Sequence, residues 1–164
     1  MGTRIGLNLG CGHKFYKSTD EIEWKNIDSQ EGSQVQADVR KLPFEDNYAD
    51  VIEAIHIVEH FFVDQIDEVL KEWKRVMKDG GEIIIEVPCM EKILVNFAEK
   101  KDMRYTWLGL YGDTISDQPH MAHHWCYSVG QMKALLEQVG FKDIKLEDPK
   151  YHMLERDMRF TARK

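Results

Sequence analysis

The fold is decided near the N-terminus, by the run Ile5-Gly6-Leu7-Asn8-Leu9-Gly10-Cys11-Gly12. Its first five residues form a short apolar run that predicts a β-strand, and the Gly-x-Gly that follows predicts a sharp turn. Two glycines let the backbone bend tightly and approach a ligand closely. In open α/β sheets, ligands bind outside the carboxyl ends of the strands, so we expect a ligand at this turn. Taken alone, Gly-x-Gly fits an ordinary tight turn equally well.

The rest of the chain alternates short apolar runs with helical patterns, which is typical of a mostly parallel sheet covered on both faces. Further strands are expected at residues 25–28, 34–38, 50–57, 82–87, 142–146 and 157–162. Only about ten residues separate the last two, too few for a parallel crossover, so they should form an antiparallel hairpin. The expected fold class is therefore α/β: a doubly wound, mostly parallel seven-stranded sheet with an antiparallel C-terminal hairpin.

The clearest helix pattern lies between the strands expected at 50–57 and 82–87. Apolar residues recur there at spacings of three and four from Ile66 to Met77, with Asp64 as a candidate cap and Gly80 as a candidate stop. By contrast, residues 13–24 lack apolar periodicity. The first helix of such a fold should therefore be short or absent.

A second helix is expected at residues 129–139. Ser128 and Gln131 form a capping box at its start, and Gly140 follows where a helix should stop. Residues 91–122 belong to no basic unit of the sheet. They should contain a short helix, an aromatic-rich stretch and a polar loop, and should emerge at the carboxyl edge of the sheet.

Composition limits the classes of function. A chain of 164 residues fits a single domain, here 1–164. The formal net charge of −7 repels phosphate backbones, so no nucleic-acid partner is expected. No apolar run is long enough for a membrane helix, and the first expected strand starts almost at once, so no signal peptide is expected either. Three scattered cysteines suit reduced thiols in a cytoplasmic protein.

An acidic residue supports a ligand site at the glycine turn. Asp28 ends the second expected strand 18 residues after Gly10, close to the ~20-residue offset at which an acid meets ribose hydroxyls in dinucleotide folds. A carboxylate can accept hydrogen bonds from both hydroxyls of a diol. An ordinary turn aspartate is the alternative. A nicotinamide cofactor is disfavoured, because Phe15 stands at the third glycine position of G-x-G-x-x-G.

Several segments together resemble one family. They are Leu7-Asn8-Leu9-Gly10-Cys11-Gly12, Asp28, the run Ala37-Asp38-Val39-Arg40-Lys41-Leu42-Pro43-Phe44-Glu45-Asp46-Asn47-Tyr48-Ala49-Asp50-Val51-Ile52, Val58-Glu59-His60, and Leu135-Leu136-Glu137-Gln138-Val139-Gly140-Phe141. The pattern is similar to that of class I, Rossmann-like S-adenosylmethionine-dependent methyltransferases, in the branch that acts on small molecules or glycans. The resemblance runs from residue 5 to about residue 146, and the terminal hairpin fits the remainder.

The resemblance implies S-adenosylmethionine as cofactor and a role for each matching position. Gly10 and Gly12 would lie under the methionine part, Asp28 would hold the ribose hydroxyls, and Asp38 and Val39 would meet the adenine. Backbone near His56 would contact the methionine ammonium group. The full expected cofactor set comprises Leu9, Gly10, Cys11, Gly12, Asp28, Ser29, Asp38, Val39 and His56.

Two residues depart from the family pattern. Asn8 stands where the family usually has an acid, and Lys14 stands where a third glycine is common. Together with the short or absent first helix, they leave open a second function: a module that binds S-adenosylmethionine or a partner without turnover. Transfer of another group, such as aminopropyl, is a third reading, but we find no acidic cluster to bind a polyamine.

Methyl transfer to a hydroxyl needs a base, and histidine near neutral pH is the best candidate. His124 and His60 are expected at the ligand edge of the sheet, as base or substrate binder. The alternatives are a helix cap for His60 and a solvent-exposed loop histidine for His124. A metal site from Asp117, His120, His123 and His124 matches no standard ligand spacing, so no metal is expected.

The sequence therefore predicts an enzyme that methylates a small molecule or glycan, at an oxygen atom. Its partner is that substrate, with a homodimer left open. The non-catalytic binding module is the alternative.

Overall fold

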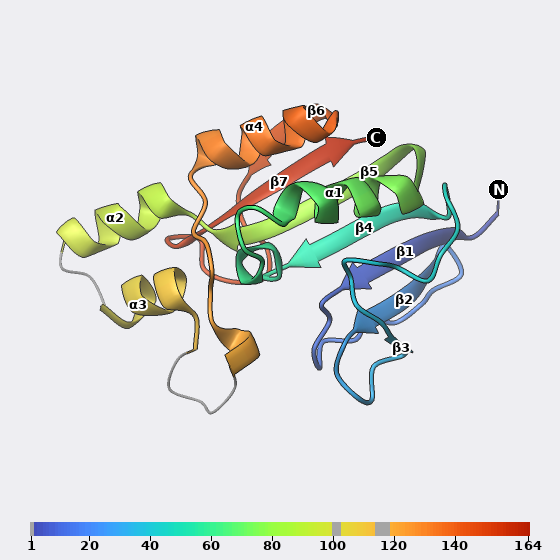
Figure 1. The fold of residues 1–164 in the computed structure, drawn as a ribbon, viewed down its shortest axis with the longest axis horizontal. Helices are drawn as coiled ribbons and strands as arrows, with labels where there is room; N and C mark the ends of the chain where they lie inside the picture. Colours follow the sequence, from blue (N-terminus) through green and yellow to red (C-terminus); the bar gives the residue numbers. More distant parts are fainter. Residues whose placement is uncertain (1, 100–102, 114–118) are drawn as a thin grey trace.

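The computed structural model describes residues 2–99, 103–113 and 119–164. Within these ranges the strands form one seven-stranded sheet in the order β3-β2-β1-β4-β5-β7-β6. The strands are β1 (Arg4–Leu9), β2 (Ile22–Asp28), β3 (Val35–Gln36), β4 (Ala49–Ile55), β5 (Met77–Pro88), β6 (Lys142–Glu147) and β7 (Asp157–Arg163). β1 to β5 pair in parallel, whereas β7 runs antiparallel to both β5 and β6. This confirms the expected sheet, including the C-terminal hairpin (Figure 1).

The helices are α1 (Ile66–Val76), α2 (Met90–Ala98), α3 (Met103–Tyr111) and α4 (Val129–Val139), with two short 3-10 helices, η1 (Val58–His60) and η2 (Pro119–Met121). α1 and α4 contact each other over one face of the sheet, and α2 packs on α3 beyond the carboxyl ends of the parallel strands (Figure 1). The aromatic-rich stretch expected within residues 91–122 is helical and forms α3. No helix in the described ranges has the length and apolar character needed to cross a membrane.

Alternate residues of the strands form the main core under α1 and α4. Leu7, Ile52, Ile85 and Phe160 point to this side of the sheet and are almost fully buried. Trp73 of α1 is the largest fully buried side chain, and its Nε1 donates to the carbonyl of Val39 at 2.9 Å. We call this side of the sheet the apolar face.

The intervening strand residues form what we call the polar face. It buries Asn8, Asn26, Glu53, Glu86 and Arg159, which the strand registers place on the same side of β1, β2, β4, β5 and β7. Chain segments around residues 14–16 and 150–152 cover it in place of a helix. Residues 10–21 contain no helix, which confirms the expectation for the first helix.

Asn8 and Asn26 fasten the first of these two segments. Asn8 Nδ2 donates to the carbonyl of Lys14 at 2.8 Å and to Asn26 Oδ1 at 2.9 Å. Asn26 Oδ1 in turn accepts from the backbone N–H of Tyr16 at 2.7 Å, and Asn26 Nδ2 donates to the Tyr16 carbonyl. Asn8, which departs from the family pattern, therefore holds the loop that stands in for the first helix.

The expected helix ends are confirmed at α4 and wrong at α1. Ser128 and Gln131 make both bonds of the capping box, and Gly140 adopts φ 86°. At α1 the N-cap is Gln65 and makes no side-chain cap bond, so Asp64 is not the cap. Gly80, with φ 75°, lies within β5 rather than at the end of the helix. The chain leaves α1 directly into β5, so no helix-stopping glycine is needed.

Candidate active site

The glycine turn has the geometry that the sequence predicts. Gly10 and Gly12 have φ 64° and 49°, in the left-handed region where a side chain is strained. A Cβ on Gly10 would also lie 2.2 Å from Ile57 Cδ1, whereas the space beside Gly12 is open. Leu9 and Cys11 are buried on either side of Gly10, and burial raises the pKa of the Cys11 thiol to about 11. Cys11 is therefore a poor nucleophile.

Asp28 lies directly against this turn. Its Oδ2 accepts from the backbone N–H of Gly12 at 2.8 Å, and its Oδ1 accepts from the backbone N–H of Gln30 at 3.0 Å. A carboxylate has about four lone-pair positions, so each oxygen keeps capacity for another donor. The next residue, Ser29, is exposed. The arrangement suits a ribose diol beside an open glycine turn.

Asp38 and Val39, the two positions expected at the adenine, are both already engaged in contacts within the protein. Asp38 is exposed and already bound by Arg40, whose Nε and Nη2 donate to it at 2.9 and 2.6 Å. These hydrogen bonds hold the pKa of Asp38 below its usual value, although its partial burial opposes this. Val39 is buried and its carbonyl is used by Trp73. An adenine amino group would therefore compete with a guanidinium at Asp38.

His56 lies at the centre of a charged cluster at the carboxyl end of β4. It has φ 53°, and its backbone N–H donates to the carbonyl of Glu86. Its Nδ1 lies 2.8 Å from Glu59 Oε1, and its Nε2 lies 3.3 Å from Asp157 Oδ2. Burial lowers the pKa of His56, but these two carboxylates outweigh it and raise the pKa to about 9. His56 is thus a cation near neutral pH.

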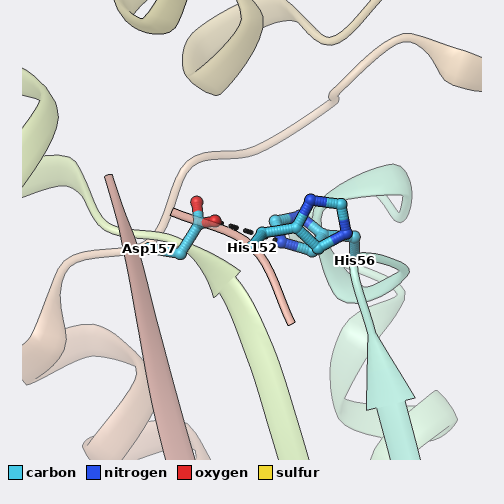
Figure 2. Close-up of side chains that lie close together, drawn as sticks. All are labelled: His56, His152 and Asp157. Carbon is cyan, nitrogen blue, oxygen red and sulfur yellow. Dashed lines mark ion pairs between the residues drawn. The ribbon is translucent and has the colours of Figure 1, made fainter. Parts of the chain in front are cut away.

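His152 completes this cluster from the other side. Its ring packs edge-on against His56 with 4.2 Å between ring centroids, and Figure 2 shows His56 and His152 together next to Asp157. Burial, the His56 cation and Lys14 lower the pKa of His152 to about 4. Lys14 Nζ lies 3.1 Å from its Nε2. A neutral histidine therefore faces a cationic one.

The two histidines predicted to act in catalysis lie close to each other in the fold. His124 and Trp125 both donate their backbone N–H to the carbonyl of Glu59, which ties their loop to η1. The His124 ring is exposed and stacks on Phe62 at 4.0 Å. His60 is half-buried, and its Nδ1 lies 2.9 Å from the carbonyl of Ala122. His60 therefore packs on this loop and does not cap α1, which begins after Gln65.

The sequence model of a family described as a methyltransferase domain matches residues 7–85, from β1 to β5.

This match covers just under half of the chain, and over these residues the chain is similar to a methyltransferase domain.

Solved structures show the same fold over almost the whole chain. An S-adenosylmethionine-dependent methyltransferase from Archaeoglobus fulgidus is 21% identical, with 99% of this chain and 87% of that chain covered and a TM-score of 0.67. An S-adenosylmethionine-dependent methyltransferase from Methanosarcina mazei is 15% identical, with 100% and 93% covered and a TM-score of 0.70.

A curated relative matches only a short stretch. The sterol 4-C-methyltransferase strm-1 of Caenorhabditis elegans is 43% identical over 51 residues. These residues are 31% of this chain and 15% of that protein. This chain therefore corresponds to a small part of that relative's length.

Three residues at the edge beside β4 and β5 were not predicted from the sequence. Glu59 was noted only as part of the Val58-Glu59-His60 signature, and His152 and Asp157 were given no role. Asp157 is fully buried and accepts from Arg156 at 2.6 and 2.9 Å. An adjacent Arg–Asp pair at the start of an apolar strand was the available signal.

The candidate metal set considered from the sequence does not come together. His123 faces Glu59, His124 stacks on Phe62, and the His120 Nε2 lies 3.3 Å from Gln30 Nε2. Asp117 lies outside the described residues.

Proposed function

We propose that this protein transfers the methyl group of S-adenosylmethionine to an oxygen atom of a small molecule or glycan. The observation that carries the proposal is the glycine turn bonded to Asp28, with an open side at Gly12 and spare acceptor capacity on the carboxylate. The bound cofactor would supply a methyl group already activated by a sulfonium. The protein then has to align the acceptor and exclude water.

The cofactor contacts follow the predicted positions. Leu9, Gly10, Cys11 and Gly12 would support the methionine part, Asp28 and Ser29 the ribose, Asp38 and Val39 the adenine, and His56 the ammonium end. The backbone N–H of His56 already donates to Glu86, so its carbonyl is the group available to an ammonium. The His56 ring carries a positive charge and would not attract one.

His124 is proposed as the base that takes the proton of the acceptor hydroxyl, with His60 as a substrate binder. The exposed ring of His124 lies at the carboxyl edge of the sheet, beside η1, and can reach a bound molecule. His60 has its Nε2 free of the contact to Ala122. A histidine base suits the near-neutral pH at which a cytoplasmic enzyme works.

Cofactor binding is tested by isothermal titration calorimetry with S-adenosylmethionine. Asp28→Asn should weaken binding by roughly 10-fold or more, since hydrogen bonds to a charged group contribute about 1.5–3 kcal/mol each. Asp20→Asn, which precedes the opposite end of the same strand, is the matched control and should bind normally. Absence of heat with the wild-type protein, or equal affinity in Asp28→Asn, contradicts the proposal.

Turnover separates the enzyme from a non-catalytic binding module. The module is favoured by Asn8, because its amide nitrogen donates to Lys14 and Asn26 and its side chain carries no negative charge for an ammonium group. Methyl transfer from labelled cofactor should be assayed against hydroxylated small molecules, sugars and a sterol. Transfer that is lost in His124→Ala supports the enzyme, whereas cofactor binding without transfer to any acceptor supports the module.

Three further predictions accompany this function. We propose that residues 1–164 act as one domain, that the protein works in the cytoplasm, where its three buried free cysteines remain reduced, and that no nucleic acid binds. The homodimer left open by the sequence is decided by sedimentation.

A further inference from the structure

Three hydrogen-bond acceptors converge where η1 meets the loop after η2. Glu59, His60 and His123 each place one nitrogen or oxygen atom within 4.8 Å of the other two. Glu59 and His60 are neighbours on η1, and His123 comes from the opposite side of the site. We call these three side chains the Glu59 triad.

The ring nitrogens that face away from the triad identify the tautomers. His60 Nδ1 lies 2.9 Å from the carbonyl of Ala122, and His123 Nδ1 lies 3.0 Å from the carbonyl of Gly109. A carbonyl oxygen only accepts, so both Nδ1 atoms carry a hydrogen. In a neutral imidazole the other nitrogen then has a lone pair. His60 Nε2 and His123 Nε2 are therefore acceptors, and His123 Nε2 lies 3.9 Å from Glu59 Oε1.

Glu59 brings a third acceptor to the same place. Its side chain is almost completely buried, and Oε1 is next to His56 Nδ1. Its Oε2 is buried and has no hydrogen-bond partner among the described residues. A buried carboxylate oxygen without a donor costs free energy, and two imidazole lone pairs nearby do not relieve it. A cation bound between the three groups would satisfy all of them.

We propose that Glu59, His60 and His123 bind a divalent transition-metal ion, zinc, with one coordination position left open. Two histidine nitrogens and a carboxylate are a ligand set that zinc accepts in catalytic sites, where a water or substrate takes the fourth position. Two ligand atoms on one tetrahedral zinc lie roughly 3.3 Å apart, given bonds of about 2.0–2.1 Å. The 3.9 Å between Glu59 and His123 closes to this value with a small movement of the side chains.

The groups behind the ligands fit this assignment. Ligating histidines in metal sites usually donate the second ring N–H to a carbonyl or carboxylate, which fixes the ring. The carbonyls of Ala122 and Gly109 do this for His60 and His123. His56 fixes Glu59 in the same way, through its Nδ1. All three ligands are thus held in place by the fold before a metal arrives.

The neighbouring cluster of His56, His152 and Asp157 (Figure 2) is similar in composition but not in its surroundings. Asp157 already accepts from both Nε and Nη2 of Arg156, and Lys14 Nζ is close to His152 Nε2. Existing cations satisfy these groups and would repel a metal ion. The Glu59 triad has no such cation among the described residues other than His56, which lies behind Glu59.

The open position gives the metal a use in the proposed reaction. His60 is half-buried on η1 and packs on the loop that carries His124, so the triad lies next to the proposed base. A metal ion lowers the pKa of a bound hydroxyl or water, which favours an acceptor with an oxygen atom next to the metal. This last step rests on the proposed function; the metal site itself does not.

The site is tested on metal-free protein prepared with a chelator, without S-adenosylmethionine. Cobalt(II) is titrated while visible absorption is recorded, and zinc binding is measured by calorimetry. We expect one ion per chain and a cobalt spectrum of low coordination number. His60→Ala and His123→Ala should each weaken zinc binding by at least 100-fold, whereas His13→Ala, at an exposed position, should not.

The outcomes are distinguishable. His152→Ala decides between the two clusters: unchanged zinc affinity supports the Glu59 triad, and loss of binding overturns it. Absence of a cobalt spectrum in the wild type also overturns the proposal. Circular dichroism confirms that each variant is folded, and a zinc-dependent rise in Tm that His123→Asn abolishes serves if His60→Ala is unstable. Cofactor calorimetry in chelator reports separately on the proposed function.

Discussion

The two faces of the sheet are built from the same strands but stabilised in different ways. The apolar face is closed by α1 and α4, with Trp73 and Phe160 among its buried side chains. On the polar face, buried side chains such as Glu53 and Glu86 are satisfied by hydrogen bonds from two loops. The stabilisation from apolar burial grows with the area that is buried. A buried polar network, by contrast, is stabilising only when every member has a hydrogen-bond partner. Tolerance to substitution should therefore differ between the faces.

The hydrogen bonds of the polar face also explain how this face is covered although the first helix is absent from residues 10–21. The carboxylate of Glu86 accepts from the backbone N–H groups of Lys150, Tyr151 and His152, at 2.9 to 3.2 Å. Tyr151 stacks on Tyr16, with 6.1 Å between ring centroids. The loops that stand in place of a helix are thus hydrogen-bonded directly to the strands. One of these bonds is made by His152, which belongs to the charged cluster of the site.

The largest effect is expected on the apolar face. Trp73→Ala should lower the free energy of unfolding by about 3–5 kcal/mol, because it leaves a cavity and an unused Val39 carbonyl. Urea denaturation followed by circular dichroism measures this. Lys71→Ala, on the exposed side of the same helix, is the control and should leave the midpoint unchanged. If the two variants behave alike, α1 does not close the core.

A slightly smaller loss is expected for the central ion pair of the polar face. Glu86→Gln should cost about 3 kcal/mol, because Arg159 remains buried with its 3.2 Å partner uncharged. Hydrogen exchange at the amides of residues 150–152 should accelerate in the same variant. Arg159→Met should cost less, since three backbone donors still satisfy Glu86. The reverse order would show that the arginine, not the loop, is what Glu86 stabilises.

The third test uses acid. Burial raises the pKa of Asp157, but His56 and Arg156 outweigh this and hold it well below the usual value. A depressed pKa contributes stability above the ordinary value of about 3.9, and this is lost as the pH falls toward the folded-state pKa. Asp157→Asn should therefore cost about 2 kcal/mol at pH 7 and flatten the loss of stability below pH 4.

Urea titrations at several pH values measure this dependence. Asp79→Asn, which removes one exposed carboxylate, controls for the change in net charge. Parallel acid curves for the wild type and Asp157→Asn would contradict the assignment of Asp157 as a buried anion.

The smallest effect is expected for the two tyrosines that share one acceptor. Tyr16 and Tyr151 both donate to Glu53 Oε2, at 3.0 and 2.8 Å. Either Tyr→Phe substitution should cost about 1 kcal/mol. The double variant should cost more than the sum, because it alone leaves the buried oxygen without a donor. Additive values in the double-mutant cycle would mean that water replaces the lost hydroxyls and that the polar face is not sealed.

The fold could be predicted from the sequence wherever it depends on local patterns. Alternating strands, the Gly10 and Gly12 turn and the Ser128 capping box depend on neighbouring residues, and the structure confirms each of them. The partners of Asn8 depend on pairings across strands, so its structural role could not be predicted. α3 was missed because the residues that it buries, Thr106 and Gly109, form no apolar stripe. Its aromatic residues Trp107 and Tyr111 stack on each other on an exposed face.

The candidate site likewise has a part that local sequence patterns predict and a part that they do not. The turn and Asp28 follow from one spacing along the chain and were predicted together. His56, Glu59 and Asp157 meet only because β4 and β7 both flank β5. No spacing along the sequence predicts this contact, because β7 is distant from β4 in the sequence and pairs antiparallel with β5. The tautomers of His60 and His123 are likewise visible only through backbone carbonyls that distant segments supply.

The position of β7 also affects how the protein is made. β7 lies between β5 and β6, and within the described sheet β6 is joined to the other strands through β7 alone. During synthesis, β5 leaves the ribosome long before residues 157–163 can pair with it. Until then the β5 edge offers unpaired N–H and C=O groups to any extended segment nearby. The nascent chain therefore passes through a stage at which a chaperone protecting that edge would have its greatest effect on yield.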